Sequence, residues 1–402
     1  MGYRMDHETN NTLIEQMLYL ISCAVHDVAP EKRVLEGLDL SSLYSLANTQ
    51  SLAAMICMTL ETTDIFENAA PEIVKQWTDA KDKAIRKNIL LDAERAQILR
   101  EMDKAGIWYL PLKGIVLQEL YPKFGMRQMA DNDILYDAAF RTQLKKFMLG
   151  RGYEAASLPE NIAKHAHDAY EKPPIYNFEM HTSLFGLSYN PAWTDYYADV
   201  KKRLVSDSPE NHAFHFTDED FYIYVSTHAC KHYQEMGNGL RMLVDAYVLN
   251  WKKGSTWDWE YIHSELKELG IANFEEQIRS LAEKLFGSTR LFSLTELSKP
   301  ELEMLFYCIG SGTYGTTQNR VENEIKKLQP VEKPITKRTK LRYYLYRLFP
   351  GREWCRAHYP FFYRHPLLLP FLWIYRIVHD VWIERKNILN EIRTIKNLGN
   401  SK

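Results

Sequence analysis

The chain has 402 residues, of which 46% are hydrophobic and 13% aromatic, so it can build buried cores and its composition excludes general disorder. A chain of this length is too long for one ordinary hydrophobic core, so we expect two or three packed subdomains. The net charge of −2 gives no argument for nucleic acid as a partner.

The cysteines and the apolar runs favour a cytoplasmic protein. Five cysteines lie far apart without paired spacing, which is typical of reduced thiols. The polar N-terminus MGYRMDHETNN has no secretory signal. The most apolar run, Leu367–Tyr375, is short and contains Pro370, so no membrane-spanning segment is predicted.

Apolar residues at helical spacing predict an N-terminal helical region, residues 1–94. Between residues 12 and 62 the pattern is broken at Pro30 and Gly37, which indicates a bundle of short helices. Residues 71–104 predict one long helix or two joined ones, whose many charges form a solvated face.

Residues 95–190 alternate between strand and helix patterns, which predicts a small α/β core with a mixed sheet. The predicted order is strand 107–112, helix 115–120, strand 131–136, helix 138–150, a strand beginning near residue 152, and strand 175–181.

The chain is helical again after residue 190. A helical domain packing on the core, residues 191–320, has its clearest helices at 221–234, 240–251, 260–270 and 272–286. Residues 313–340 are polar and predict a linker or a loop over the functional site. A linker and basic aromatic helices make up residues 321–402. The predicted class is therefore α+β, with a small mixed β-sheet core flanked by N- and C-terminal helical regions.

Asp131 and Asp133 carry the strongest chemical signal. Residues two apart in a strand point to one face, and neighbouring carboxylates repel each other unless a cation neutralises them. A hard divalent ion with oxygen ligands is the natural candidate. Upstream, the turn at Lys113 and Gly114 could place an ammonium and backbone N–H groups beside a phosphate. Together these features suggest phosphoryl or nucleotidyl transfer.

Several segments resemble a known family. LPLKG, an Arg shortly before D-x-D, and a later strand with Glu between apolar residues are similar to the nucleotidyltransferase fold shared with DNA polymerase beta. Within it, the chain most resembles the bacterial family labelled "uncharacterised nucleotidyltransferase". RKNILLDAERAQILREMDKAGIWYLPLKG resembles the family's lead-in, HACKH and LRMLVD its helical follow-on, and GSGTYG is a weaker match. The resemblance covers residues 70 to 320.

The resemblance implies Mg²⁺-dependent transfer of a nucleoside monophosphate from an NTP, with ATP expected, to a hydroxyl acceptor, with release of pyrophosphate. Asp131, Asp133 and Glu179 would be the catalytic carboxylates that hold one or two Mg²⁺ ions, and Glu179 could also be the base. The expected nucleotide-binding residues are Lys113, Gly114, Arg127, Lys231 and Arg241. The acceptor could be a sugar, an antibiotic, a lipid-linked glycan precursor or a protein side chain.

Two positions depart from the family pattern. The turn usually carries a Ser beside the glycine, whereas Ile115 follows Gly114 here and leaves the phosphate to backbone amides and Lys113. Asn132 replaces the usual apolar residue and would face the core, where an unpaired amide costs about 1–3 kcal/mol. These departures motivate an alternative function, a catalytically weak nucleotide-binding or scaffold protein that retains the fold.

Two of the predicted site residues have alternative partners. Arg127 could form a surface ion pair with Asp131 or Asp133 rather than contact the triphosphate. Glu179 could be a buried strand carboxylate paired with His181.

Five residues on two later helices form a second group of candidates. His228, Lys231 and His232 share a helix face, and their spacing permits zinc, although H-E-x-x-H is absent and packing is the simpler interpretation. Arg241 and Asp245, four residues apart, could form an ion pair. One or two of the five are expected to reach the nucleotide or the acceptor.

The C-terminal tail combines cations and aromatic rings. Residues 337–386 hold eleven Lys and Arg among many Tyr, Trp and Phe. The simplest interpretation is terminal helices packed on the core with their cations exposed. Peripheral contact with an anionic membrane is the alternative, and base stacking is a weaker one.

Overall fold

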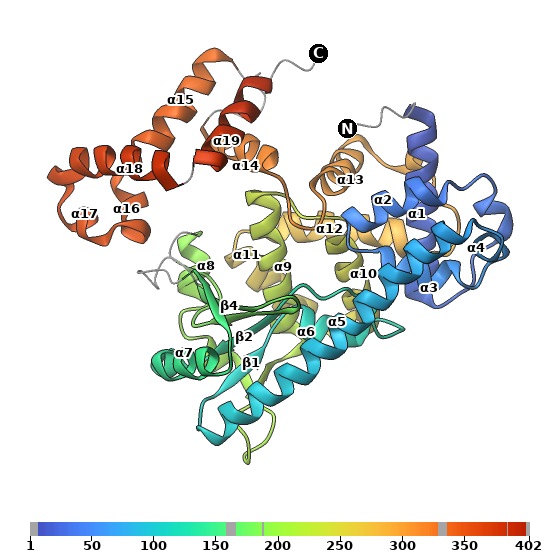
Figure 1. Cartoon of the computed structure of the whole chain (residues 1–402), viewed down its shortest axis with the longest axis horizontal. Coiled ribbons are helices and arrows are strands. Elements are labelled where there is room, and N and C mark those ends of the chain that lie inside the picture. Colours follow the sequence, from blue (N-terminus) through green and yellow to red (C-terminus); the bar gives the residue numbers. More distant parts are fainter. Residues whose placement is uncertain (1–6, 158–165, 187–188, 329–335, 384, 399–402) are drawn as a thin grey trace.

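A computed structural model describes residues 7–157, 166–186, 189–328, 336–383 and 385–398. Helices predominate and surround a five-stranded sheet, with a two-stranded sheet beside it (Figure 1). The predicted α+β class with a small mixed sheet is confirmed.

A bundle of helices forms the N-terminal part, as the spacing of apolar residues predicts. Its helices are α1 His7–His26, α2 Leu40–Thr49, α3 Ala53–Leu60, α4 Asp64–Glu67 and α5 Pro71–Lys104. The last is one uninterrupted helix of 34 residues that starts with Pro71, where the missing N–H has no helical partner to lose. It extends from the bundle along the sheet (Figure 1).

The main sheet has the strand order β1-β2-β5-β4-β3. Its strands are β1 Tyr109–Pro111, β2 Asn132–Tyr136, β3 Glu154–Ser157, β4 His167–Lys172 and β5 Tyr176–His181. Only β2 and β5 pair in parallel, and the other neighbours are antiparallel. The prediction from sequence found the other strands but not β4.

The alternation of side chains along β2 divides two cores. Ile134 and Tyr136 point to a core that includes Leu91 of α5 and Leu144 of α7, the helix Arg141–Gly150. Leu135 points the other way, into a core built largely on α9, Asp218–Glu235. Because side chains in a strand alternate, Asp133 lies on the α9 side with Leu135.

The helices predicted after residue 218 are all present. Besides α9 they are α10 Arg241–Lys253, α11 Trp259–Glu268 and α12 Ala272–Phe286. A further helix that was not predicted individually, α13 Lys299–Ser311, follows them. One large core joins α10, α12 and α13 to the N-terminal bundle. The N-terminal bundle therefore packs against helices that come much later in the chain. The sheet lies against α9 and α10.

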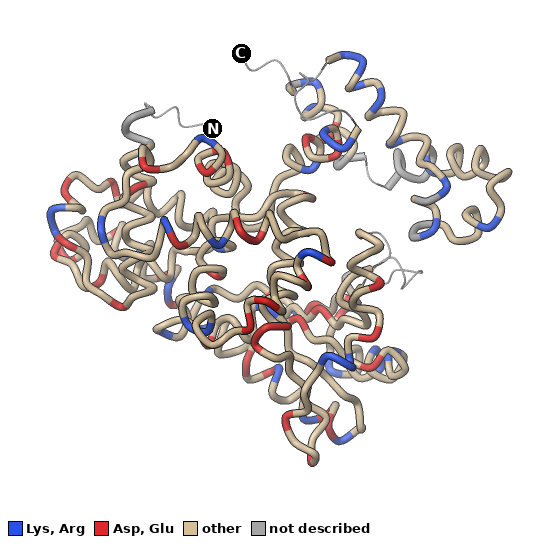
Figure 2. The backbone as a smooth tube through the Cα atoms, turned by 180° about the vertical axis from the view of Figure 1, so that it is seen from behind, with Lys and Arg blue, Asp and Glu red and all other residues tan. Residues whose placement is uncertain are grey.

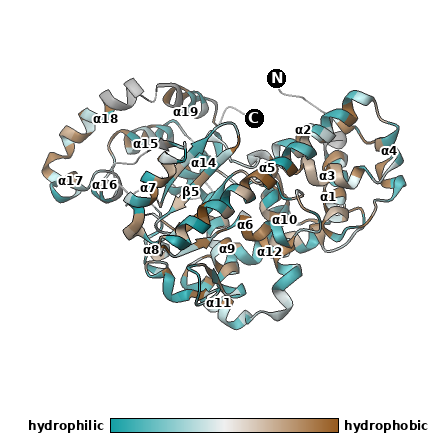
Figure 3. Cartoon of the chain, turned by 60° about the horizontal axis from the view of Figure 1, so that its bottom comes forward, coloured by the Kyte–Doolittle hydropathy of each residue, from teal (hydrophilic) through white to brown (hydrophobic). Residues whose placement is uncertain are grey.

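A group of C-terminal helices projects from this body in two views (Figures 1 and 3). It comprises α14 Thr317–Leu328, α15 Lys337–Leu348, α16 Arg352–His358, α17 Pro360–Arg364, α18 Leu369–Ile383 and α19 Arg385–Asn397. The expected linker over residues 313–340 is therefore wrong in its centre, where α14 packs on α9. In the described part of the chain, no helix combines the length and the apolar character needed to cross a bilayer.

Candidate active site

Two carboxylates lie side by side on neighbouring parallel strands. Asp133 of β2 is in register with Glu179 of β5. Because residues paired across a sheet share a face, both side chains leave the sheet on the side of α9. Asp131 lies one residue before β2, and electrostatic interaction couples its carboxyl to both others. The three carboxylates predicted from the sequence thus lie close together.

A cavity of about 330 Å³ lies between this face of the sheet and the helices α9 and α10. From the sheet and its connections it is lined by Lys113, Gly114, Arg127, Asp131, Asp133 and Glu179. From the two helices it is lined by polar residues that include His228, His232, Arg241 and Asp245. A small molecule that enters this cavity meets carboxylates and the Lys113 ammonium on one wall, and imidazole and guanidinium groups with the Asp245 carboxylate on the other.

Positive and polar groups hold Asp133 in place. Lys113 Nζ lies 2.7 Å and His181 Nε2 lies 2.9 Å from the same Asp133 Oδ1. Burial alone would raise the pKa of Asp133, but the Lys113 ammonium and the His181 imidazole hold it well below its usual range. Asp133 is therefore a carboxylate at any physiological pH.

Asp131 is in the opposite situation. Burial and the negative charges of Asp133 and Glu179 raise the pKa of Asp131 to about 7. A positive charge placed among the three carboxyls would remove this repulsion. The donor set consists of carboxylate oxygens from three side chains, which is the set that Mg²⁺ and other hard divalent ions prefer. The oxygen donors therefore suit such an ion in chemistry, while the ligand atoms that lie within 4.8 Å of one another among the described residues are those of His167, Glu179 and His181.

Two histidines flank Glu179 and add nitrogen atoms to the site. Glu179 Oε2 lies 3.5 Å from His181 Nε2 and 3.8 Å from His167 Nε2. Ligand atoms of the three side chains lie within 4.8 Å of one another, close enough to surround one metal ion. Burial raises the pKa of Glu179, but its hydrogen bond with His181 is among the effects that bring it below its usual value. Glu179 therefore pairs with His181, as the alternative interpretation predicts, and also lies beside Asp133 in the sheet.

The Lys113–Gly114 turn is tightly constrained. Lys113 has φ 46° and ψ −114°, a conformation that costs energy in any residue with a side chain. A Cβ on Gly114 would lie 2.5 Å from Arg127 Nη1 and 3.0 Å from the Met129 side chain. Glycine is therefore required at position 114, because the chain passes directly over Arg127 there.

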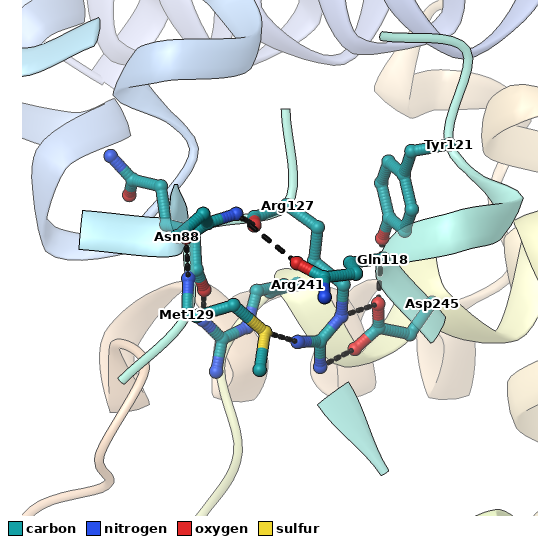
Figure 4. A network of polar contacts seen from close by, with 8 residues as sticks. Asn88, Gln118, Tyr121, Arg127, Met129, Arg241 and Asp245 are labelled. Atoms are coloured by element: carbon teal, nitrogen blue, oxygen red, sulfur yellow. Dashed lines mark hydrogen bonds and ion pairs between the residues drawn. The ribbon is translucent and has the colours of Figure 1, made fainter. Parts of the chain in front are cut away.

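Arg127 anchors the segment before the aspartates (Figure 4). Its Nε and Nη2 donate to the two carboxylate oxygens of Asp245 at 2.8 and 2.9 Å, and Tyr121 Oη donates to the same carboxylate at 2.6 Å. The alternative pairing of Arg127 with Asp131 or Asp133 is therefore wrong, since the guanidinium binds Asp245. The side chain lines the cavity, but its charge is balanced by α10.

A buried amide completes this network (Figure 4). Asn88 of α5 donates to the Arg127 carbonyl at 3.0 Å and accepts from the Met129 N–H at 3.1 Å. Arg241 Nη1 donates to the Gln128 carbonyl at 2.9 Å. The expected ion pair between Arg241 and Asp245 is not formed, because Arg127 occupies the carboxylate. Two helices thus hold the chain from Tyr121 to Met129 in place.

The buried side-chain amide of Asn132 has hydrogen-bond partners at both ends. It is fully buried on the α5 side, as its place in the strand predicts. Its Oδ1 accepts from Arg95 at 2.8 Å and its Nδ2 donates to the Leu91 carbonyl at 3.2 Å. The expected penalty for an unpaired amide is therefore wrong, since α5 satisfies both ends of the group.

The α9 histidines form a close pair at the cavity. His228 Nε2 and His232 Nε2 are 3.0 Å apart. Burial lowers the pKa of both, that of His232 to about 3, so the imidazoles are neutral. Lys231 does not line the cavity, and its ammonium lies 4.2 Å from the Tyr189 ring centroid. Burial lowers the pKa of Lys231 to about 8.

Some residues in or beside the site were not predicted from the sequence. His167 lies on the strand that sequence patterns missed. Asn238 and Tyr314 line the cavity from two glycine-containing loops, and Gly237 and Gly315 have positive φ angles in those loops. The two glycines could have indicated these loops in the sequence, because glycine permits turns whose backbone approaches a ligand closely. Part of the expected loop over the site is thus present at Thr313 and Tyr314.

The fold and the site define an α+β protein with an acidic cavity between a mixed sheet and two helices. Residues 36–287 match the family described as "Uncharacterised nucleotidyltransferase". The match covers more than half of the chain, so the chain belongs to this family, which supports a nucleotidyltransferase role. The weaker GSGTYG resemblance lies outside the matched residues. Neither a curated protein nor a solved structure matches the chain.

Proposed function

We propose that this protein transfers a nucleoside monophosphate from an NTP, with ATP expected, to a hydroxyl acceptor and releases pyrophosphate. The observation that carries the proposal is the register of Asp133 with Glu179 on parallel strands, beside Asp131 and within one cavity. Lys113 and His181 balance the charge of Asp133, but burial and the negative charges of Asp133 and Glu179 still raise the pKa of Asp131 to about 7.

Asp131, Asp133 and Glu179 would hold the Mg²⁺ required for the reaction. Mg²⁺ bound there would neutralise the triphosphate and make the acceptor hydroxyl more acidic. Asp133, which is ionised at any physiological pH, would be the first of the three to bind a cation. The carboxyl of Asp131 would then lose its proton, because the repulsion that raises its pKa would be balanced.

Lys113 is the residue best placed to hold phosphate. Its strained backbone directs the ammonium to the cavity wall, where it now pairs with Asp133. Once a metal ion binds the Asp133 carboxylate, the Lys113 ammonium can turn to a phosphate oxygen. It would then exchange one charge-assisted hydrogen bond for another. Arg241 lines the opposite wall and could contact the same ligand.

Glu179 is proposed to accept the proton of the acceptor hydroxyl. Its carboxylate is ionised because the hydrogen bond with His181 is among the effects that lower its pKa, and its side chain is 25% exposed, more than that of Asp133. A partly exposed carboxylate at the mouth of the site can meet an incoming hydroxyl. The acceptor itself could be a sugar, an antibiotic, a lipid-linked precursor or a protein side chain.

The alternative is a nucleotide-binding protein with little catalytic activity. Ile115 supplies no hydroxyl beside Gly114, and the pair between Lys113 and Asp133 would compete with metal binding. The two functions share the cavity and differ in turnover.

Calorimetric titration with each NTP in Mg²⁺, together with an assay of pyrophosphate release with candidate acceptors, tests the proposal. Asp133→Asn should weaken Mg²⁺-dependent nucleotide binding at least about tenfold and abolish turnover. Glu171→Gln, an exposed carboxylate of β4 in the same sheet, is the matched control and should bind as the wild type does. Tight binding without turnover would favour the alternative. Equal binding by wild type and Asp133→Asn would refute the metal site.

A further inference from the structure

The C-terminal helices carry a charge opposite to that of the rest of the chain. Residues 336–402 contain fourteen Lys and Arg but four Asp and Glu, a net charge of +10. Because the whole chain has −2, residues 1–335 carry −12. Lys and Arg predominate on the described part of these helices (Figure 2). A charge separation of this size attracts the C-terminal helices to an anionic surface and repels the remainder from it.

The same helices expose large apolar side chains. Among the described residues, twenty-one large hydrophobic side chains are exposed, and twelve of them lie between residues 341 and 389. The most exposed is Leu367, at 91%, followed within this segment by Phe371 and Ile374 at 66% and 64%. With Phe361 of α17 they are referred to as the apolar tip. Hydrophobic stretches of α17 and α18 are visible at the end of the molecule (Figure 3).

The apolar tip is not part of the core that holds these helices together. That core consists of Val321, Ile325, Tyr343, Ile395 and Leu398, on or beside α14, α15 and α19. Tyr343 Oη also donates to Glu391 at 2.5 Å, and Arg347 Nε donates to the same carboxylate at 3.0 Å. The core that joins α14, α15 and α19 therefore contains none of the tip's side chains.

Exposed arginines lie on the helices next to the tip. Arg352 and Arg356 are on α16, and Arg364 ends α17, directly before the segment with Leu367. An arrangement of apolar side chains with neighbouring cations suits the boundary between acyl chains and phosphate headgroups. A second copy of the chain is a poorer match for the tip, because it would bring two groups of net charge +10 together.

We propose that the C-terminal helices dock the protein on an anionic lipid bilayer. The apolar tip inserts at the level of the acyl chains, and the neighbouring arginines pair with headgroup phosphates. This inference is independent of the proposed function, since the helices and the cavity share none of the residues that carry either proposal.

Co-sedimentation of the full chain with vesicles tests the inference. Vesicles of phosphatidylglycerol and phosphatidylcholine in equal parts should bind the protein, phosphatidylcholine alone should bind it far more weakly, and salt should reduce binding. Leu367→Glu/Phe371→Glu should reduce binding at least about tenfold, and Arg352→Gln/Arg356→Gln/Arg364→Gln should reduce it on anionic vesicles.

The matched control is Phe306→Glu, which changes an exposed phenylalanine of α13 outside the C-terminal helices and should bind as the wild type does. All substituted side chains are exposed, and circular dichroism checks that each variant is folded. Wild type that does not bind anionic vesicles would overturn the proposal. A concentration-dependent dimer that the Leu367→Glu/Phe371→Glu variant loses, without any vesicle binding, would assign the tip to self-association instead.

Discussion

At the scale of single residues, the site is defined by how neighbouring charges are balanced. Lys113 and His181 hold the pKa of Asp133 well below its usual range, whereas burial and the neighbouring carboxylates raise the pKa of Asp131 despite nearby cations. The two aspartates therefore differ in what they need. Asp133 is fully ionised near neutral pH, and Asp131, with a pKa of about 7, is only partly so until a cation favours its charged form.

His181 is predicted to position the carboxylates for metal binding. Its Nε2 lies within 2.9 Å of Asp133 and 3.5 Å of Glu179, so it links the two strands through their functional groups. His181→Ala should weaken binding of Mn²⁺ alone by about tenfold or more, because partners that orient metal ligands typically contribute that much. Calorimetry with Mn²⁺ measures this effect.

His181→Gln, which keeps an N–H donor, should recover part of the Mn²⁺ affinity. The control is His215→Ala, an exposed histidine of β7, Phe214–Phe216. Affinity of His181→Ala equal to that of the wild type would mean that the imidazole is only a packing group.

Gly114→Ala should destabilise the protein because there is no room for a methyl group. The added Cβ would lie 2.5 Å from Arg127 Nη1, whose guanidinium is fixed by Asp245. Overpacking of this kind costs about 1–3 kcal/mol. Urea unfolding measures the loss. Gly150→Ala at the end of α7 is the matched control, since nothing lies within 4 Å of its Cβ position and it should be neutral or stabilising. An equal change in the free energy of unfolding for both variants would show that the turn at Gly114 is not crowded.

At the scale of elements, Glu391 makes the C-terminal helices sensitive to acid. Burial raises its pKa, but hydrogen bonds from Tyr343 and Arg347 outweigh burial and lower it. A carboxyl with a folded-state pKa below its unfolded value contributes stability above the unfolded pKa, and this contribution is lost as pH falls through the folded pKa. The helices should therefore loosen in acid.

Hydrogen exchange of α15 and α19, compared between wild type and Glu391→Gln at each pH, tests this expectation. The variant should exchange faster at pH about 7, and the difference should vanish well below the ordinary glutamate pKa of about 4.3. A difference of the same size at both pH values would show that the charge of Glu391 does not matter.

Sequence patterns predicted the elements that bury apolar faces and missed those that bury polar groups. The helices α5, α9, α10, α11 and α12 have clear apolar periodicity. In β4 one of the two buried residues is Asp168, whose charge is balanced by Arg141 at 2.6 Å, so the strand does not look amphipathic. In α14 only Val321 and Ile325 are buried, too few to mark a helix.

The residues of the candidate site were likewise predicted only in part. Local spacing identified the residues of the Lys-Gly turn and the D-x-D pair, because their chemistry depends on near neighbours in the chain. The partner of Arg127 lies 118 residues away on α10, and His167 comes from a strand without a clear pattern. Such contacts depend on how distant elements pack, which a single sequence does not encode in its periodicity.

At the scale of the whole molecule, the acidic body and the basic C-terminal helices place the two proposed activities on different parts of the chain. The cavity lies between the sheet and the helices α9 and α10, and α14 packs on α9 as well as on α15 and α19 of the projecting group. If those helices bind a lipid surface, the cavity is held near that surface. This arrangement favours an acceptor that is itself at a membrane, but it leaves the chemistry of the cavity unchanged.

The most direct test of the central claim is a crystal structure with Mn²⁺ and a hydrolysis-resistant ATP analogue, in which anomalous scattering locates the metal. We expect a metal within about 2.0–2.3 Å of oxygens of Asp131, Asp133 and Glu179, with Lys113 moved from Asp133 to a phosphate. A nucleotide bound elsewhere, with Lys113 and His181 still on Asp133 and no metal among the carboxylates, would contradict it.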